Sequence, residues 1–295
     1  MRIGLIYHQF IPRGGLEGYL LEFCKRLCAA GHELHVVASE VSPLLSKHLG
    51  ATIHQVPVIK GSPIVRMWQF ERAVAGIGRA CRELGVPVIS GNVRLYNETE
   101  GKGILPTPTV GMVGLIDDAA YTGRAGFCDE GDVILLLGEA GGSLAGSEWL
   151  HVLHGKLGGR IPRVDLAREK ALGELLRQGY QDGTLKSAHD VSEGGLAIAL
   201  AECCLLGSGV GAQIKLDPID RVDSLLFGEA PGRVVVTATA ANARKLEKAA
   251  TKAGVPTRKL GKVTGDHFEW KGLFQLSHGT LRDVHEGGLR AIVGS

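Results

Sequence analysis

The stretch from residue 86 to residue 98 constrains the fold of this chain more than any other. The short apolar run Val86–Ile89 predicts a buried strand, and it stops abruptly at Ser90 and Gly91. A glycine at the end of a strand lets another group approach the backbone closely. Asn92 then offers a neutral oxygen of the kind that Mg²⁺ accepts beside phosphates. The residues alone leave two interpretations open, a metal-bound phosphate site or a strand followed by a polar turn.

A second polar motif, His189–Gly195, ends one predicted strand and opens the apolar helix Leu196–Leu206. Asp190 is a hard, anionic metal ligand at a position where helix N–H groups also point. The alternative is structural, with Ser192 as the N-cap of the helix after a tight turn. His189 is expected to be a packed or capping histidine rather than a general base.

Two further patterns indicate a binding site less specifically. The glycine-rich segment 141–147 opens a predicted helix and could form a phosphate nest. His151 and His154 have a spacing compatible with a metal, but without a third ligand nearby we expect a solvated helix face. Hydrophobic spacing also predicts helices at 68–84, 165–181, 241–253 and 280–289, strands at 110–116, 132–137 and 234–238, and a hairpin at 267–275.

The composition excludes several classes of function. Hydrophobic residues make up 44% of the chain and charged residues 22%, as in globular proteins, and the formal net charge of +2 is too small for a nucleic-acid surface. The N-terminus lacks a signal-peptide pattern, and no apolar run approaches the roughly 20 residues of a membrane span. We therefore expect a cytoplasmic protein with no nucleic-acid and no membrane partner. Its six cysteines include no CxxC pair and are expected to be reduced.

The first part of the chain has the pattern of a βαβ unit. Residues 2–7, 34–38 and 53–58 predict strands, and 16–30 predicts a helix with one apolar face. The segments Arg13–Glu17 and Ala30–Val37 resemble the opening of glycosyltransferases that have two Rossmann-like domains. A domain covering residues 1–66 is therefore expected, with a join at about 62–67 to an unrelated second part.

From about residue 67 to residue 295 the chain resembles the second half of the phosphoribosylformylglycinamidine synthase family, within the aminoimidazole ribonucleotide synthase-like superfamily. The motifs that carry this resemblance are Gly91–Thr99, Leu105–Pro108, Val110–Leu115, Ser187–Leu196 and Leu226–Glu229. The resemblance implies an α/β fold for the chain, of the α+β type in the synthase-like part. This part would comprise an incomplete ATP-site domain at 67–128 and a complete C-terminal α/β domain at 129–295.

The family uses ATP to phosphorylate the amide oxygen of formylglycinamide ribotide, and ammonia then displaces the phosphate. The resemblance implies that Gly91 contacts ATP through its backbone and that Asn92 holds Mg²⁺. Arg94 stands at a substrate position where the family normally has a smaller serine. Asp190, Gly194 and Gly195, together with the Glu229 loop, would line a second, non-catalytic nucleotide site in which Asp190 also binds the metal.

The resemblance also implies what this sequence does not carry. The catalytic histidines of the family belong to the first half of the synthase, so no catalytic residue is assigned here. The expected function is that of a synthase chain that requires ATP, Mg²⁺, a complementing synthase chain and the glutaminase and amidotransferase-partner subunits. Two alternatives remain open: a non-catalytic nucleotide-binding or fusion product, and a glycosyltransferase remnant.

Overall fold

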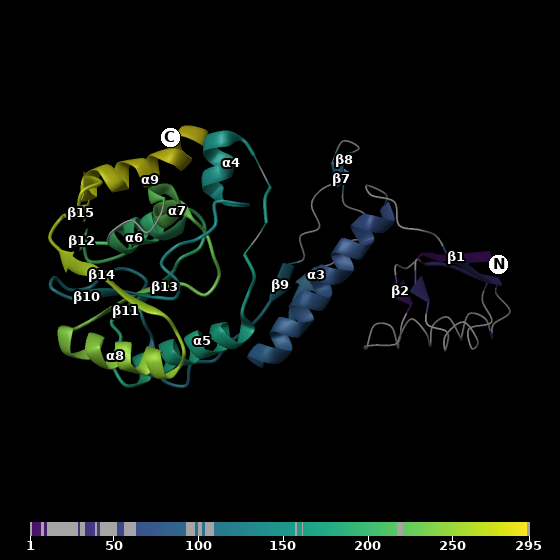
Figure 1. Ribbon diagram of the computed structural model, residues 1–295, viewed down its shortest axis with the longest axis horizontal. Helices are drawn as coiled ribbons and strands as arrows, with labels where there is room; N and C mark the ends of the chain where they lie inside the picture. Colours follow the sequence, from purple (N-terminus) through teal and green to yellow (C-terminus); the bar gives the residue numbers. More distant parts are fainter. Residues whose placement is uncertain are drawn as a thin grey trace. The chain divides into compact units, whose positions relative to one another are not determined.

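A computed structural model describes residues 2–6, 9–10, 29, 33–38, 40–41, 52–55, 63–92, 98–99, 102–103, 109–156, 158–160, 162–216 and 221–293. The chain divides into two compact units, residues 1–113 and 114–295 (Figure 1). Each unit is described by itself.

The first unit opens with a parallel sheet. Strands β1 (Arg2–Ile6), β3 (Glu33–Ala38) and β5 (Thr52–Gln55) lie in the order β1-β3-β5, and both pairings are parallel. The short strands β2 (Gln9–Phe10) and β4 (Glu40–Val41) pair in parallel as well. The predicted parallel arrangement is confirmed. The helix predicted at 16–30 lies outside the described residues except for residue 29, which is helical.

Helix α3 (Pro63–Leu84) is longer than the predicted helix and begins before it. Proline suits the first position of a helix because its missing N–H has no partner to lose there. The chain leaves the helix at Gly85, whose φ of 69° is accessible to glycine at low cost. The helix therefore passes through the segment where a join between two parts was expected.

The buried strand predicted at Val86–Ile89 is wrong. Regular structure begins only at β6 (Ser90–Asn92), which pairs antiparallel with β9 (Thr109–Gly111). The side chains of Val88 and Ile89 are 49% and 60% exposed. An apolar run is buried as a strand only where neighbouring elements flank and cover it, and among the described residues β6 pairs with β9 alone. A second short pair joins β7 (Glu98–Thr99) and β8 (Lys102–Gly103).

The second unit is built on a mixed sheet in the order β11-β13-β10-β14-β12-β15-β16. All its pairings are antiparallel except β12 with β15. The strands are β10 (Val133–Leu137), β11 (Ser187–Asp190), β12 (Gly211–Ile214), β13 (Val234–Ala238), β14 (Thr257–Thr264), β15 (His267–Trp270) and β16 (Phe274–Ser277). The strands predicted at 132–137 and 234–238 and the hairpin at 267–275 are thereby confirmed.

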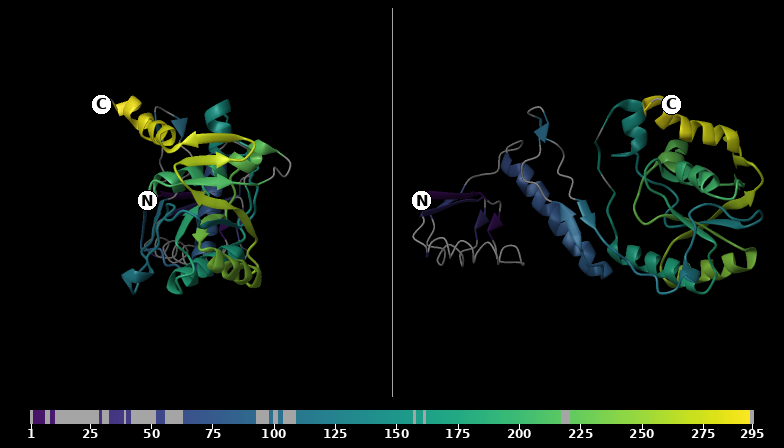
Figure 2. Two further views of the ribbon diagram at one scale, coloured as in Figure 1. Left: turned by 90° about the vertical axis from the view of Figure 1, so that its left-hand side faces the viewer. Right: turned by 180° about the vertical axis from the view of Figure 1, so that it is seen from behind.

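Helices cover both faces of this sheet (Figure 1, Figure 2). Helices α5 (Leu166–Gln181) and α8 (Ala240–Lys252) lie on one face, and α6 (Gly195–Leu205), α7 (Val222–Phe227) and α9 (His278–Val293) lie on the other. A short 3₁₀ helix, Ala119–Tyr121, precedes the sheet, and α4 (Glu148–His154) follows β10. The helices predicted at 165–181 and 241–253 are confirmed. The last helix begins two residues before the predicted Thr280.

The alternation of side chains along β10 explains why the unit has two cores. Val133, Leu135 and Leu137 pack toward α5 and α8, whereas Ile134 and Leu136 pack toward α6 and α7. All five are at most 4% exposed. A strand that is covered on both faces requires a continuous apolar run, which is what the sequence of β10 provides.

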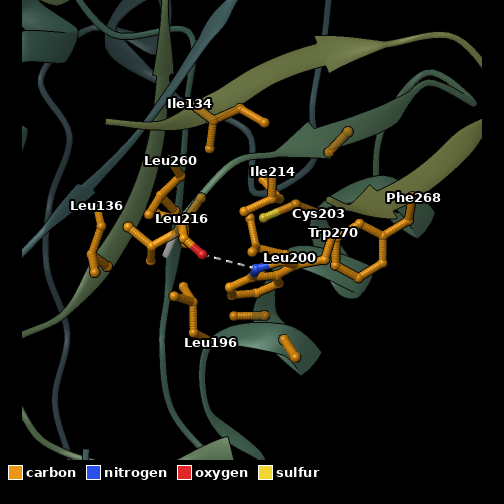
Figure 3. Close-up of a cluster of buried hydrophobic side chains, with 14 of the residues drawn as sticks. Ile134, Leu136, Leu196, Leu200, Cys203, Ile214, Leu216, Leu260, Phe268 and Trp270 are labelled. Atoms are coloured by element: carbon orange, nitrogen blue, oxygen red, sulfur yellow. Dashed lines mark hydrogen bonds between the residues drawn. The ribbon is translucent and has the colours of Figure 1, made fainter. Parts of the chain in front are cut away.

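Trp270 anchors the core on the α6 side (Figure 3). Its side chain is 1% exposed, and its indole Nε1 donates to the backbone oxygen of Leu216 at 3.4 Å. Cys203 and Cys204 lie in the same core as free thiols, and the other described cysteines, Cys81 and Cys128, are also unbridged. The expected reduced state therefore holds for these four cysteines, and Cys24 and Cys28 lie outside the described residues.

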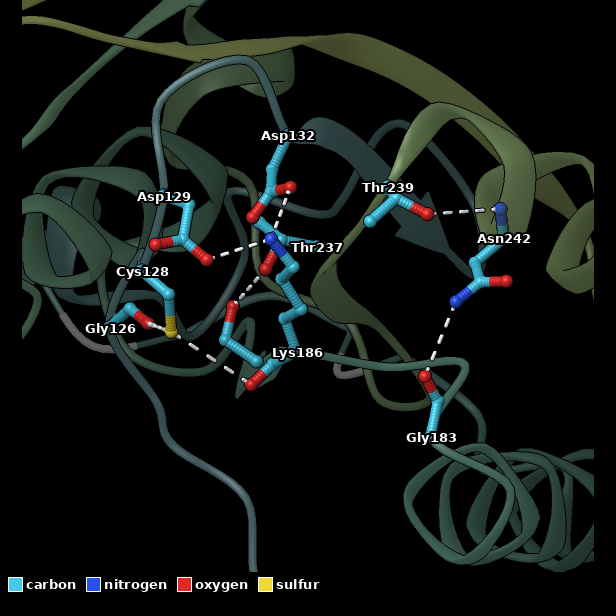
Figure 4. A network of polar contacts seen from close by, with 10 residues as sticks. Gly126, Cys128, Asp129, Asp132, Gly183, Lys186, Thr237, Thr239 and Asn242 are labelled. Carbon is cyan, nitrogen blue, oxygen red and sulfur yellow. Dashed lines mark hydrogen bonds and ion pairs between the residues drawn. The ribbon is translucent and has the colours of Figure 1, made fainter.

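A polar network at the edge of the sheet surrounds Lys186 (Figure 4). Its Nζ donates to the carboxylates of Asp129 and Asp132 at 2.7 and 2.8 Å. The Asp132 side chain is only 5% exposed, and its Oδ2 has no hydrogen-bond partner. Lys186 is therefore the cation that permits a carboxylate to be buried here. Within the described part of the chain, no helix has the length and apolar character needed to cross a membrane.

Candidate functional site

Asp190 is the last residue of β11, at the end of the sheet where the polypeptide turns into α6. The Ser192 hydroxyl donates to Asp190 Oδ2, and this hydrogen bond is the main reason why the pKa of Asp190 lies below its ordinary value. The other oxygen, Oδ1, faces the His189 ring at 3.9 Å. With 72% of its side chain exposed, Asp190 keeps one carboxylate oxygen open to a ligand.

Ser192 is not the N-cap of the helix, contrary to one of the two alternatives. Gly194 occupies that position with a φ of 77° and makes no side-chain cap. The Ser192 hydroxyl instead donates to the Asp190 carboxylate, a charged acceptor. The His189 ring contacts the backbone oxygen of Asp190 at 2.7 Å and Glu202 at 3.6 Å, and its side chain is 13% exposed. His189 is therefore the packed histidine that we expected.

Glu229 contacts the loop between β11 and α6 through its carboxylate. Its Oε1 accepts hydrogen bonds from the backbone N–H groups of Gly194 and Glu148, both at 2.9 Å. These groups belong to the first turns of α6 and α4, where N–H groups have no partner within the helix. One carboxylate thus joins the beginnings of two helices, and negative charge is favourable at both.

The loop that carries Glu229 is fixed to the glycine-rich segment 141–147. Ser143 and Glu229 exchange two backbone hydrogen bonds, of 2.9 and 2.8 Å. Ser224 Oγ donates to the backbone oxygen of Gly142 at 2.7 Å. A Cβ on Gly142 would lie 2.3 Å from the carbonyl carbon of Gly228, so glycine is required for the two segments to meet. The segment predicted as a phosphate nest is thus occupied by contacts with this loop.

Arg233 lies at the end of the same loop and is 2% exposed. Its Nη2 donates to the backbone oxygen of Gly228 at 2.6 Å, and its Nε donates to that of Ala230 at 3.4 Å. The third nitrogen, Nη1, is buried without a hydrogen-bond partner. Burial lowers the pKa of Arg233 to about 10, and the nearby Glu229 counteracts only part of this effect.

These residues line a cavity of about 490 Å³ within the second unit. Its walls are the segment 190–193 after β11, the segment 229–234 before β13, Glu169 and Leu172 of α5, and the residues Ala145, Gly146 and Pro162. Asp190 and the Glu229 loop, which the sequence placed in one site by resemblance, do lie around one cavity. A volume of this size accommodates a small ligand.

Gly194 and Gly195 are explained by packing. A Cβ on Gly194 would lie 2.6 Å from Ile198 Cγ1, and one on Gly195 would lie 2.7 Å from the carbonyl carbon of Phe227. Their N–H groups donate to Glu229 and to the backbone oxygen of Ser192, respectively. The two glycines therefore allow α6 to begin close to the Glu229 loop, beside the cavity.

Three of the predicted ligand-binding residues, Gly91 for ATP, Asn92 for Mg²⁺ and Arg94 for substrate, belong to the first unit, whereas Asp190, Gly194 and Gly195 belong to the second. Gly91 and Asn92 lie in β6, opposite Val110 and Thr109 of β9, and Gly91 is exposed. Arg94 lies outside the described residues. Across the part of the chain that the structure describes, no group of three or more His, Cys, Asp or Glu side chains is arranged to hold a metal ion.

His151 and His154 form an exposed helix face, as expected. His151 Nδ1 lies 3.5 Å from Glu148 Oε2, and the His154 ring packs against Trp149 with 4.8 Å between ring centroids.

Sequence reasoning missed the part that Arg233 has in the site. The loop Phe227–Arg233 showed one acid and one base without a recognisable pattern. The available signal is the position of Arg233 immediately before the apolar run 234–238, since the residue that leads into a buried strand is itself close to the core. Only the structure shows that this arginine is buried with one nitrogen unpaired.

Two family models match the chain. Residues 49–116 match the AIR synthase related protein, N-terminal domain, and residues 129–270 match the AIR synthase related protein, C-terminal domain. The N-terminal match begins inside the segment 1–66 and continues past it.

Curated relatives agree with this assignment. A phosphoribosylformylglycinamidine synthase subunit PurL from Anaeromyxobacter sp. (strain K) is 47% identical over 236 residues, 77% of this chain and 31% of the relative. The PurL subunit from Frankia casuarinae is 41% identical over 288 residues, 98% of this chain and 36% of the relative. The chain thus spans about a third of the length of these relatives. The expected glycosyltransferase-like character of residues 1–66 is not supported, because the Frankia match extends over nearly the whole chain.

The solved structure of T. maritima PurL complexed with ATP resembles this chain with a TM-score of 0.52. The identity is 18%, and the match covers 70% of this chain and 34% of that protein. This likeness shows a shared fold, and the predicted α/β class is confirmed. Over residues 49–116 and 129–270, this chain therefore belongs to the AIR synthase related family.

Proposed function

We propose that this chain supplies the C-terminal third of a phosphoribosylformylglycinamidine synthase, an ATP-dependent carbon–nitrogen ligase of purine biosynthesis. The observation that carries the proposal is the 47% identity over 236 residues to a subunit of that name. Since the matched span is a third of the relative, the proposed activity also requires the other two thirds of the synthase.

In the proposed reaction, ATP transfers its γ-phosphoryl group to the amide oxygen of formylglycinamide ribotide. Ammonia attacks the activated carbon, phosphate leaves, and the products are the amidine, ADP and phosphate. Such phosphoryl transfer depends on positioning and on neutralisation of charge rather than on covalent chemistry by the protein. A glutaminase subunit would supply the ammonia.

Two groups of residues have roles in this proposal. Gly91 would contact ATP through its backbone, Asn92 would hold Mg²⁺ with its amide oxygen, and Arg94 would contact the substrate. The cavity beside Asp190 would be a second, non-catalytic nucleotide site bordered by Gly194 and Gly195. Mg²⁺ suits both places because it takes hard oxygen ligands and completes its shell with phosphates and water.

The test combines this chain with a relative's synthase from which the matched third has been deleted. Amidine formation from ATP, formylglycinamide ribotide and an ammonium salt should require both chains, since the salt replaces the glutaminase. In the assembled complex Asn92→Ala should lower kcat/KM about tenfold or more, whereas Arg79→Ala on the exposed surface of α3 should not change it. A complex that forms and remains inactive would overturn the proposal.

A substitution of Arg94 tests the proposed substrate position in the same complementation assay. Arginine is much larger than the serine usual in the family and would crowd a site shaped for a hydroxyl group. Arg94→Ser should therefore raise the activity of the complemented complex.

A second candidate is nucleotide binding without catalysis. The observation that favours it is that the 490 Å³ cavity is formed entirely by residues of the second unit. Nucleotide binding by a complemented complex that makes no amidine would select this candidate.

A further inference from the structure

Helix α8 and strand β14 concentrate positive charge in one short stretch of the chain. Residues 240–262 contain seven Lys or Arg residues and one acidic residue, Glu247. The rest of the chain contains 26 basic and 30 acidic residues, so its net charge is negative. The positive charge of this stretch is therefore a local feature and not a property of the whole chain.

The cations of α8 form a row along its exposed side. Arg244, Lys248 and Lys252 are exposed, whereas Leu246 and Ala250 of the same helix are buried against the sheet. Residues four apart in a helix lie above one another on one side, about 6 Å apart along the axis. The three cations are therefore evenly spaced over two turns of the helix.

Strand β14 adds two lysines on the same side of the sheet. Lys259 lies opposite Leu135 of β10 and Lys262 lies opposite Val133, and both β10 side chains pack toward α8. Opposite residues of paired strands point to the same face, so the two lysines lie on the face that α8 covers in part. Helix α8 packs against β10, β13 and β14 (Figure 1), and both lysines remain exposed. We define the basic surface as Arg244, Lys248, Lys252, Lys259 and Lys262.

The described part of the chain does not neutralise the basic surface. None of its five cations has an ion pair or a side-chain hydrogen bond with another described residue. By contrast, Arg168 and Arg177 of the neighbouring helix α5 and Lys186 of the sheet edge are each paired with a carboxylate. Several like charges on one surface repel one another and attract a partner of opposite charge.

The residue types of this stretch distinguish between acidic partners. Residues 240–262 contain no aromatic residue on which a nucleic-acid base could stack. They also contribute no exposed large apolar side chain that could insert into a membrane. A nucleic acid would carry its charge beyond the basic surface to the rest of the chain, whose net charge is negative. An acidic segment of a protein can be confined to the basic surface, which favours a protein partner.

We infer that the basic surface docks an acidic segment of a partner protein, with carboxylates about every 6 to 7 Å along one side of that segment. Alternate residues of an extended segment have this spacing, because each residue advances the chain by about 3.3 Å. The spacing matches the row of cations on α8. Association through exposed charges is fast and sensitive to salt. The inference does not depend on the proposed ligase function.

The test follows the fluorescence anisotropy of a labelled twelve-residue peptide of alternating Glu and Ser while the full chain is added. Wild type should bind at low ionic strength, and the affinity should fall as salt is added. The triple variant Lys248→Glu, Lys252→Glu and Lys259→Glu should bind about tenfold more weakly or worse, because three attractive contacts become repulsive. Substitution of the same three lysines by arginine keeps the charge and should preserve binding.

A second triple variant makes the same change in net charge elsewhere on the second unit. Lys156→Glu, Arg160→Glu and Arg163→Glu alter exposed cations of the segment before α5 and should weaken binding by less than about threefold. Glu247→Gln removes the one negative charge of the stretch 240–262 and should strengthen binding.

Carbodiimide cross-linking of wild type locates the peptide even if a variant does not fold, because it joins peptide carboxylates to lysine amino groups in contact. The cross-linked residues should be Lys248, Lys252, Lys259 or Lys262. Absence of binding at low salt, equal losses in the two glutamate triple variants, or cross-links confined to other lysines would overturn the inference. Tighter binding of a uridine dodecanucleotide, or of phosphatidylserine vesicles, through the same lysines would overturn it as well, since the partner would then belong to another class.

Discussion

One oxygen of the Glu229 carboxylate accepts a hydrogen bond from the backbone N–H of Gly194 at 2.9 Å, although 35 residues separate them. The same oxygen accepts from Glu148 N–H. Glu229 therefore supplies the side-chain acceptor that α6 lacks at its N-cap Gly194, and it adds a second acceptor to α4, whose own N-cap Ser147 accepts from Leu150 N–H. Glu229→Ala should lower the free energy of unfolding by about 2 kcal/mol, because it leaves two donors without this acceptor. Glu229→Gln keeps an oxygen there and should cost about half as much.

Chemical denaturation followed by tryptophan fluorescence measures this effect, with buried Trp270 reporting on the second unit. Glu193→Ala removes an exposed carboxylate from the same cavity and should change stability by less than about 0.5 kcal/mol. Equal effects of Glu229→Ala and Glu193→Ala would show that the hydrogen bonds of Glu229 contribute nothing to stability.

Lys186→Met should destabilise the second unit by about 3 kcal/mol, since it leaves the buried Asp132 carboxylate without a cation. Adding Asp132→Leu should restore part of the loss, because the unpaired charge is then gone. Urea denaturation of the single and double variants measures both effects. The matched control is Lys245→Met, an exposed lysine of α8. A double variant less stable than Lys186→Met would contradict this explanation.

The same lysine predicts an alkaline effect. Burial alone would lower the pKa of Lys186, but hydrogen bonds to Asp129 and Asp132 outweigh it, and the pKa is raised above the ordinary value of 10.5. A raised pKa in the folded state stabilises the fold fully below the unfolded pKa. That contribution disappears as pH rises through the folded pKa. The stability gap between wild type and Lys186→Met should therefore narrow above about pH 10.5, as measured by urea denaturation across this range.

Gly195→Ala should destabilise the chain by at least about 3 kcal/mol, because two costs add. The φ of 73° is unfavourable for alanine, and the new Cβ would lie 2.7 Å from the backbone of Phe227, which has no flexible end to move aside. Gly183→Ala is the matched control. Its φ is 67° but nothing lies within 4 Å, so it should cost only about 1–2 kcal/mol. Similar losses in thermal denaturation would show that the backbone conformation alone matters.

The buried thiols of Cys203 and Cys204 should resist alkylation at pH 8 until the chain unfolds. Burial raises the pKa of both, to about 12 for Cys204, so that only about one molecule in ten thousand carries that thiolate. Mass spectrometry of alkylated peptides with and without denaturant measures the difference. Rapid labelling of the native protein would show that α6 opens readily.

The hydrophobic pattern of the sequence predicted most of the helices and strands of the second unit. The apolar run at 132–137 predicted a strand, which the structure has as β10, and the predicted strand 234–238 matches β13 at both ends. The same reasoning failed at Val86–Ile89, where Val88 and Ile89 are exposed. The sequence of a strand shows which of its side chains are apolar and therefore favour burial. Whether they are buried depends on neighbouring strands contributed by other parts of a chain.

The candidate site shows the same division. By its resemblance to a family, the sequence by itself placed Asp190 and the Glu229 loop in one site. Both residues are carboxylates, so the site was expected to bind its ligands through charged, hard oxygen atoms. Only the tertiary structure decided that Glu229 joins the beginnings of α4 and α6 and that Arg233 is buried with an unpaired nitrogen. The physical reason is that hydrogen bonding and desolvation depend on what surrounds a side chain. The neighbours of Glu229 and Arg233 come from segments far apart in sequence.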